Sequence, residues 1–177
     1  MLFKVRDLEI KPIRFETEYR AGEIDYLDDS LRQATPLSVR GKVEWMGSVG
    51  EIHLTGELQV EMEADCDRCL ETARFPVNEK LDLFYRPAES LEGGSEVGLE
   101  EGESEVGFFE GEGLELREVV REQVLLALPV QRLCREGCQG LCPVCGGNLN
   151  RQVCSCAAEF HDERFAALKS LRLKEQK

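Results

Sequence analysis

The residues of this chain that are best suited to chemistry are its eight cysteines, which fall in two parts of the sequence. The later part contains Cys142-Pro-Val-Cys145-Gly-Gly, followed by Cys154-Ser-Cys156. Two thiolates separated by two residues can bind one tetrahedral ion, and the glycines that follow let backbone amides turn toward the sulfurs. We therefore predict a zinc knuckle with Cys142, Cys145, Cys154 and Cys156 as ligands.

The return pair of this knuckle departs from the usual zinc-ribbon spacing, because a single residue separates Cys154 from Cys156. One of the two is then replaceable as a ligand, and Cys138 or Cys134 is the natural substitute. Zinc is favoured over iron because it suits closed four-thiolate structural sites, although a Cys-Pro-x-Cys-Gly loop also occurs in rubredoxin-like iron proteins. Since structural zinc contributes on the order of 10 kcal/mol to folding, we expect this module to unfold first without metal.

The earlier cysteines form the sequence Cys66-Asp-Arg-Cys69, which has three interpretations. The two thiols supply half of a second zinc site that Cys134 and Cys138 complete, or they are reduced thiols at a β-turn without metal, or they catalyse thiol–disulfide exchange. A thioredoxin-type motif begins an amphipathic helix, whereas residues 71–76 are typical of a turn into another strand. The redox interpretation is therefore the least favoured.

Most of the elements that position these cysteines are expected to be β-strands. Residues 39–44 and 52–62 alternate between polar and apolar side chains, which is typical of half-buried strands. Residues 80–86 repeat the pattern, with a shorter strand at 75–77. Residues 2–19 are a candidate for a further strand, and Asp28-Asp29-Ser30 for the cap of a short helix. We predict an antiparallel sheet.

Two helices are expected after the strands. Apolar residues recur at helical spacing over residues 116–127 until Pro129 ends the pattern, and this helix should pack on the sheet. Residues 162–173 form a second amphipathic pattern, ending in cations that a helix C-terminus favours. The fold class is then α+β, an antiparallel β-sheet domain with a packed helix, a small cysteine-rich zinc-knuckle module and a C-terminal helix. The expected boundaries are a β-rich domain at 1–87, an acidic Gly/Glu linker at 88–113, the packed helix at 114–133, and the metal module with its helix at 134–177.

The charge of the chain restricts its partners. With 22 basic and 35 acidic residues the net charge is −13, which repels a phosphate backbone and disfavours unaided RNA binding. Residues 88–113 contain nine Glu and seven Gly without Lys, Arg or Asp. We interpret this segment as a flexible linker that either keeps the protein in solution or attracts a basic partner. Neither an export signal nor a membrane-length apolar run is apparent, so we expect a cytoplasmic protein.

Few sequence features favour an enzyme. There is no phosphate-binding Gly-x-x-x-x-Gly-Lys loop, no Gly-x-Ser-x-Gly elbow and no His-Glu-x-x-His helix, and only two histidines are present. A zinc ion saturated by thiolates also lacks the open position that hydrolysis requires. We expect no catalytic residues.

Several motifs together resemble the YceD-like family of large ribosomal RNA subunit accumulation proteins. They are Asp65-Cys-Asp-Arg-Cys-Leu70 after a β-rich half, Leu126-Ala-Leu-Pro129, the cysteine-rich run from Cys134 to Gly146, and Phe165-Ala-Ala-Leu168. The resemblance implies a bacterial ribosome-biogenesis factor that supports rRNA accumulation or processing through a large-subunit ribosomal protein or a pre-ribosomal particle. The alternatives are a direct zinc-ribbon RNA-binding protein and a thiol–disulfide oxidoreductase that uses Cys66 and Cys69.

The resemblance also singles out Arg68 beside Cys66 and Cys69 as a binding residue. A guanidinium group is a planar donor fork that suits a phosphate or a carboxylate, and an ordinary local salt bridge is the alternative role for this side chain.

Overall fold

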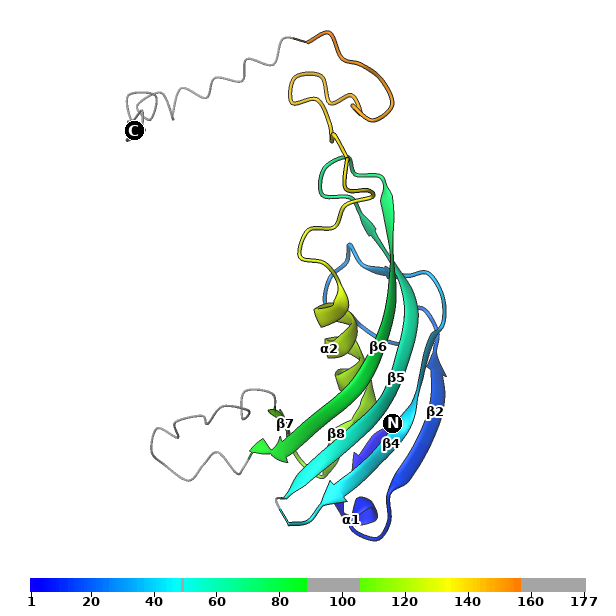
Figure 1. The fold of residues 1–177 in the computed structure, drawn as a ribbon, viewed down its shortest axis with the longest axis vertical. Helices are drawn as coiled ribbons and strands as arrows, with labels where there is room; N and C mark the ends of the chain where they lie inside the picture. The colour runs from blue at the N-terminus through cyan, green and yellow to red at the C-terminus, as the bar shows by residue number, and fades with distance from the viewer. Residues whose placement is uncertain (49, 89–105, 157–177) are drawn as a thin grey trace, which may run out of the picture.

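The computed structural model describes residues 1–48, 50–88 and 106–156 of the 177-residue chain. In chain order its elements are β1 (Leu2–Lys4), α1 (Val5–Leu8), β2 (Ile13–Tyr19), β3 (Arg32–Gln33), β4 (Leu37–Met46), β5 (Glu51–Asp65), β6 (Thr72–Pro87), β7 (Val106–Phe109), β8 (Gly113–Glu115) and α2 (Leu116–Ala127). Figure 1 shows a curved sheet with α2 against one face and the cysteine-rich segment beyond the end of the β5–β6 hairpin.

The main sheet has the strand order β2-β4-β5-β6-β7, with β3 added beside β5, while β1 and β8 pair separately. All of its pairs are antiparallel except β6–β7, which is parallel. The expectation of a purely antiparallel sheet was therefore wrong at this edge. A parallel connection needs a dozen or more residues, and the interval from Ala88 to Glu105 provides that length.

The β5–β6 hairpin is the longest feature of the sheet, and its register runs from Ile52 opposite Tyr85 to Asp65 opposite Thr72. The two strands expected at 75–77 and 80–86 form one strand, because β5 supplies hydrogen-bonding partners along the whole length of β6. Leu54, Leu58 and Met62 are fully buried on the face of β5 that looks into the core, as the alternation predicted.

Helix α2 covers this face and has the bounds that its apolar spacing predicted. Leu116, Val119, Val120 and Val124 are buried and belong to the same hydrophobic core as the strands. The helix ends at Ala127, two residues before Pro129, which has no N–H to donate. No helix in the described ranges is long and apolar enough to cross a membrane.

Four other expectations have different outcomes. The prediction of a short helix after Asp28 was wrong. The Asp28 carboxylate accepts hydrogen bonds from the backbone N–H and the hydroxyl of Ser30, and this local turn is followed by β3. Residues 2–19 contain two strands and a single helical turn rather than one strand. At the end of the segment interpreted as a linker, residues 106–109 form β7 and Gly113 begins β8. The helix expected at 162–173 lies outside the described residues.

Candidate metal centres

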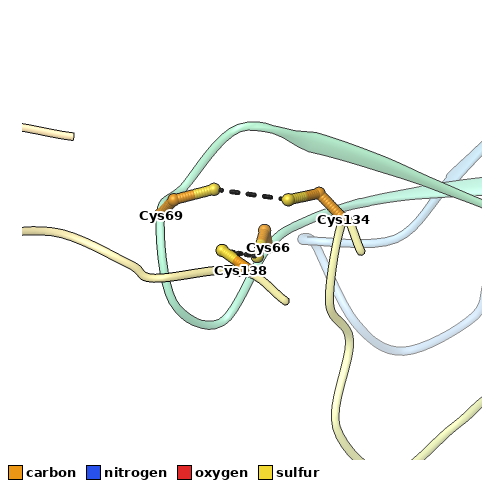
Figure 2. A group of neighbouring side chains, drawn as sticks. All are labelled: Cys66, Cys69, Cys134 and Cys138. Carbon is orange, nitrogen blue, oxygen red and sulfur yellow. Dashed lines mark hydrogen bonds between the residues drawn. The ribbon is translucent and has the colours of Figure 1, made fainter. Parts of the chain in front are cut away.

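The inner site, as we name it, consists of Cys66, Cys69, Cys134 and Cys138, whose sulfur atoms all lie within 4.8 Å of one another. The Sγ atoms are 3.8 Å apart in the pair Cys66–Cys138 and 3.6 Å apart in the pair Cys69–Cys134. Figure 2 shows the four side chains converging from the tip of the β5–β6 hairpin and from the segment after α2. The site thus joins residues that are about 70 positions apart in the sequence.

The backbone near the inner site holds these two segments against each other. The N–H of Asp67 donates to the carbonyl of Arg132 at 2.9 Å, and the N–H of Arg132 donates to the Asp67 carboxylate at 2.7 Å. The guanidinium of Arg132 also forms an ion pair with Asp28 at 2.9 Å. Cys66, Cys69 and Cys138 are consequently almost inaccessible to solvent.

The outer site consists of Cys142, Cys145, Cys154 and Cys156, whose sulfur atoms also lie within 4.8 Å of one another. The Sγ of Cys154 is 3.4 Å from that of Cys142 and 3.5 Å from that of Cys145. Cys145 is exposed, whereas no member of the inner site is. The single residue between Cys154 and Cys156 does not keep either sulfur out of this group, because the N–H of Cys156 turns back to the Sγ of Cys154 at 3.3 Å.

The two Cys-x-x-Cys loops have the same backbone geometry. In the inner loop the N–H of Leu70 donates to the carbonyl of Cys66 at 2.9 Å, and the N–H of Cys66 donates to the carbonyl of Glu71 at 2.8 Å. In the outer loop the N–H of Gly146 donates to the carbonyl of Cys142 at 2.9 Å, and the N–H of Cys142 donates to the carbonyl of Gly147 at 2.8 Å. The residue after the second cysteine has a left-handed backbone in both loops, with φ of 60° at Leu70 and 70° at Gly146. The inner loop is therefore a second knuckle, with leucine where the outer loop has glycine.

This difference makes a prediction for Leu70→Gly. A left-handed conformation costs a non-glycine residue about 1 kcal/mol, and Leu70 is 66% exposed, so its removal sacrifices little burial. We expect the substitution to raise the free energy of unfolding by about 1 kcal/mol in chemical denaturation. The reciprocal control, Gly146→Ala, should lower it by a similar amount. A lower stability of Leu70→Gly would contradict the assigned geometry.

Backbone amides stabilise negative sulfur in both sites. Burial opposes ionisation of Cys66, but N–H groups of Arg68, Cys134 and Cys69 outweigh it and lower the pKa of Cys66 to about 6. In the outer site the N–H groups of Cys145 and Val144 lower the pKa of Cys142 to about 6. Each loop is therefore organised around a thiolate, which is the form of cysteine that binds metals.

One thiol of each site has the opposite shift. Burial and then the neighbouring thiols of the inner site raise the pKa of Cys134 to about 12. Cys154 and Cys145 raise the pKa of Cys156 to about 12 in the outer site. Cys134 and Cys156 therefore keep their protons while no cation is bound, and a metal ion in either site would displace them.

Both donor sets fit zinc. A zinc–thiolate bond is about 2.3 Å long, so the sulfurs of a regular tetrahedron lie about 3.8 Å apart. The Sγ separations given above range from 3.4 to 3.8 Å. Four soft thiolate ligands without a carboxylate or imidazole are typical of structural zinc sites. The eight cysteines therefore form two groups that could each hold one metal ion, and their assignment as zinc ligands stays a prediction.

Arg68 lies on the exposed turn of the inner loop, and its guanidinium donates to the carbonyl oxygen of Cys138 at 2.9 Å. The backbone carbonyl of Arg68 accepts from the N–H of Leu141 at 3.0 Å. In this structure Arg68 thus attaches the hairpin tip to the backbone of the cysteine-rich segment, and its predicted role in binding a phosphate or carboxylate stays a prediction.

Asn150 is a residue of these sites that the sequence pattern does not predict. Its side-chain amide donates to the Sγ of Cys138 at 3.4 Å, and its carbonyl oxygen accepts from the guanidinium of Arg135 and the N–H of Gln139. Asn150 therefore links the loop of the outer site to a sulfur of the inner site. Its only signal in the sequence is its place between the two cysteine pairs of the outer site.

This fold and its sites define a class of protein in which one helix packs on a β-sheet and a cysteine-rich C-terminal segment carries two candidate metal centres. The chain belongs to the YceD family: the family described as "Large ribosomal RNA subunit accumulation protein YceD" matches residues 54–172. That range includes all eight cysteines.

Individual relatives agree with this membership. The Arabidopsis thaliana protein named "Large ribosomal RNA subunit accumulation protein YCED homolog 1, chloroplastic" is 32% identical over 59 residues, covering 33% of this chain and 18% of that protein. Uncharacterized proteins of Mycobacterium tuberculosis and Mycobacterium bovis are 31% identical over 147 residues, or 82% of this chain. The chain spans 62% of the length of these mycobacterial proteins. No solved structure matches it.

Proposed function

We propose that this protein is a non-enzymatic ribosome-biogenesis factor that supports accumulation or processing of large-subunit ribosomal RNA by binding a basic ribosomal protein or a precursor particle in the cytoplasm. The observation that carries the proposal is the family match over residues 54–172, whose description concerns accumulation of this RNA. The acidity of the chain supports a basic protein as the direct partner, because a net charge of −13 attracts Lys-rich and Arg-rich surfaces.

In this proposal both metal centres hold structural zinc. The inner site would fasten the cysteine-rich segment to the hairpin tip, and the outer site would order residues 142–156. Four thiolates fill the coordination of a tetrahedral zinc ion, so neither ion would have a position for a reacting water. The role of the metal is then to fix the shape of a binding surface.

Depletion of the protein in its source organism tests this function. We expect the ratio of mature large-subunit to small-subunit ribosomal RNA to fall, and large-subunit precursors to rise, in sequencing and sucrose-gradient profiles. Re-expression of the wild-type chain should restore the ratio. An unchanged ratio under full depletion would refute the proposal.

The two alternative functions, direct RNA binding and thiol–disulfide exchange, predict different experimental results. A direct RNA-binding protein should lose affinity for purified large-subunit RNA steeply with salt, and three arginines against one glutamate between Val130 and Cys156 favour this candidate. An oxidoreductase should have a rapidly alkylated Cys66 or Cys69 in the metal-loaded protein. The burial of both sulfurs supports the structural role.

A further inference from the structure

A groove of about 880 Å³ is lined by residues of α2, β7 and β8. These elements lie at the end of the sheet that is distant from the cysteine-rich segment (Figure 1). The lining of the groove includes the apolar side chains of Leu2, Phe108 and Leu126 and the carboxylates of Glu110, Glu118 and Glu122. We call it the α2 groove. Neither the metal centres nor the core accounts for these residues.

Three apolar side chains of the α2 groove are unusually accessible. Leu126 is 71% exposed, although it follows the buried Val124 in the same helix, and Phe108 and Leu2 are each 45% exposed. Large exposed apolar residues that gather in one concave place mark interaction sites, since scattered ones are the normal condition of a protein surface. This part of the groove therefore suits the apolar face of a partner segment.

The charged lining of the α2 groove is mostly negative. Glu110, Glu118 and Glu122 are exposed, and none of them forms an ion pair with another residue in the described part of the chain. Arg121 is the one basic residue among the described residues that line the groove. An occupant that places Lys or Arg beside these carboxylates is attracted to the groove and oriented in it.

The negative charge of the groove also helps to decide which segment is its better occupant. Residues 89–105, which precede β7, contain seven Glu and no Lys or Arg, so their charge has the same sign as the carboxylates that line the groove. Repulsion disfavours this segment as the occupant. A lining that combines exposed apolar side chains with carboxylates instead fits an amphipathic segment that combines aliphatic or aromatic anchors with basic residues.

We propose that the α2 groove binds a basic amphipathic segment of a large-subunit ribosomal protein. The identity of the partner class rests on the proposed function, whereas the place and chemistry of the site rest on the groove. Leu126 and Phe108 act as the apolar contacts, and Glu118 and Glu122 contact the partner's cations.

The test is a quantitative pull-down with full-length, zinc-loaded protein and the proteins extracted with concentrated salt from large ribosomal subunits of the source organism. Bound proteins are identified and quantified by mass spectrometry. We expect the wild type to retain a Lys-rich and Arg-rich protein, and Glu118→Lys/Glu122→Lys and Leu126→Ala each to reduce its retention by about tenfold or more.

Matched controls separate the groove from general electrostatics and hydrophobicity. Glu16→Lys/Glu18→Lys makes the same charge change on exposed positions of β2, and Ile10→Ala shortens a side chain that is 80% exposed. Both controls should bind as the wild type does. An equal loss in the control variants, full retention by the groove variants, or no binding to the wild type would overturn the proposal.

Photo-crosslinking from a benzoylphenylalanine at position 126, with position 10 as the control, identifies the occupant directly. A crosslink to a basic segment of a large-subunit protein is the expected result. A crosslink to RNA or to residues 157–177 of this chain would overturn it. The RNA ratio in depleted cells is a separate measurement. If depletion leaves the ratio unchanged while the groove still binds its partner, the proposed function alone is refuted. If depletion lowers the ratio and expression of the groove variants restores it fully, the role of the groove is refuted.

Discussion

Replacement of Cys69 by serine is expected to lower the zinc content from about two ions to about one per chain and to release the cysteine-rich segment from the sheet. Cys69 is 3% exposed, and its Sγ lies 3.6 Å from that of Cys134. Serine is a poor zinc ligand at neutral pH because its hydroxyl stays protonated. Structural zinc contributes on the order of 10 kcal/mol to the folding of such modules, which is comparable with the whole stability of a domain.

Two measurements follow the effect of Cys69→Ser. Elemental mass spectrometry gives the zinc content, and hydrogen exchange reports the amides of Asp67 and Arg132, which bond across the two segments. We expect both amides to lose most of their protection, because the ion no longer holds the hairpin tip against the segment after α2.

Cys145→Ser is the matched control, because it makes the same chemical change in the outer site, where Cys145 is exposed. It should also remove one ion, but it should leave the amides of Asp67 and Arg132 protected. If both variants exposed these amides equally, the two sites would be one cooperative unit. A wild-type protein that contains no metal and has eight reactive thiols would contradict both centres.

Local chemistry made much of the candidate site predictable. Cys142-Pro-Val-Cys145-Gly is sufficient to predict a knuckle, because every feature it needs lies within five residues. The grouping of Cys66 and Cys69 with Cys134 and Cys138 was one of several interpretations, since nothing near either pair identifies its partner. Formation of the group depends on the long hairpin that brings residues 66–71 to the segment after α2.

The same distinction applies to the fold. The spacing of Val119, Val120 and Val124 describes α2 correctly because it records which face of one element is buried. No sequence pattern predicts the parallel pairing of β7 with β6. A four-residue strand is too short to show a period, and its direction depends on the path of the preceding connection. Asp28 was misassigned because a side chain that caps a helix also closes an isolated turn.

The inner loop departs from the common knuckle pattern, which explains why its geometry was harder to predict from the sequence. Leu70 occupies the left-handed position where the outer loop has Gly146, so the Cys66-x-x-Cys69 sequence lacked the glycine that makes a knuckle easy to recognise. The hydrogen bonds of the loop hold the backbone in that conformation despite the side chain. The strain at Leu70 is small beside the free energy that a zinc ion would supply, so the site tolerates it.

The second large effect is expected in the sheet, where Gly41→Ala should destabilise the protein strongly. Gly41 lies opposite Gly56 in the β4–β5 register, and a Cβ at Gly41 would overlap the carbonyl oxygen of Thr55 and lie 3.0 Å from the Cα of Gly56. Both of these contacts are backbone, so the strands themselves must separate. The ring of Phe15 fills the space over this glycine, since its Cζ would lie 3.1 Å from the added carbon.

We expect Gly41→Ala to lower the free energy of unfolding by about 3 kcal/mol, which corresponds to roughly 10 °C in the unfolding temperature of a chain of this size. Gly47→Ala is the control with the same added atom, because its Cβ would meet only the indole of Trp45 at an ordinary 3.6 Å. Thermal unfolding followed by circular dichroism compares the two. Equal unfolding temperatures would mean that β4 and β5 do not approach each other at Gly41 and Gly56. The strong destabilisation would instead show that this close approach, which admits Phe15 to the core, fixes the strands that support the β5–β6 hairpin and its candidate metal centre.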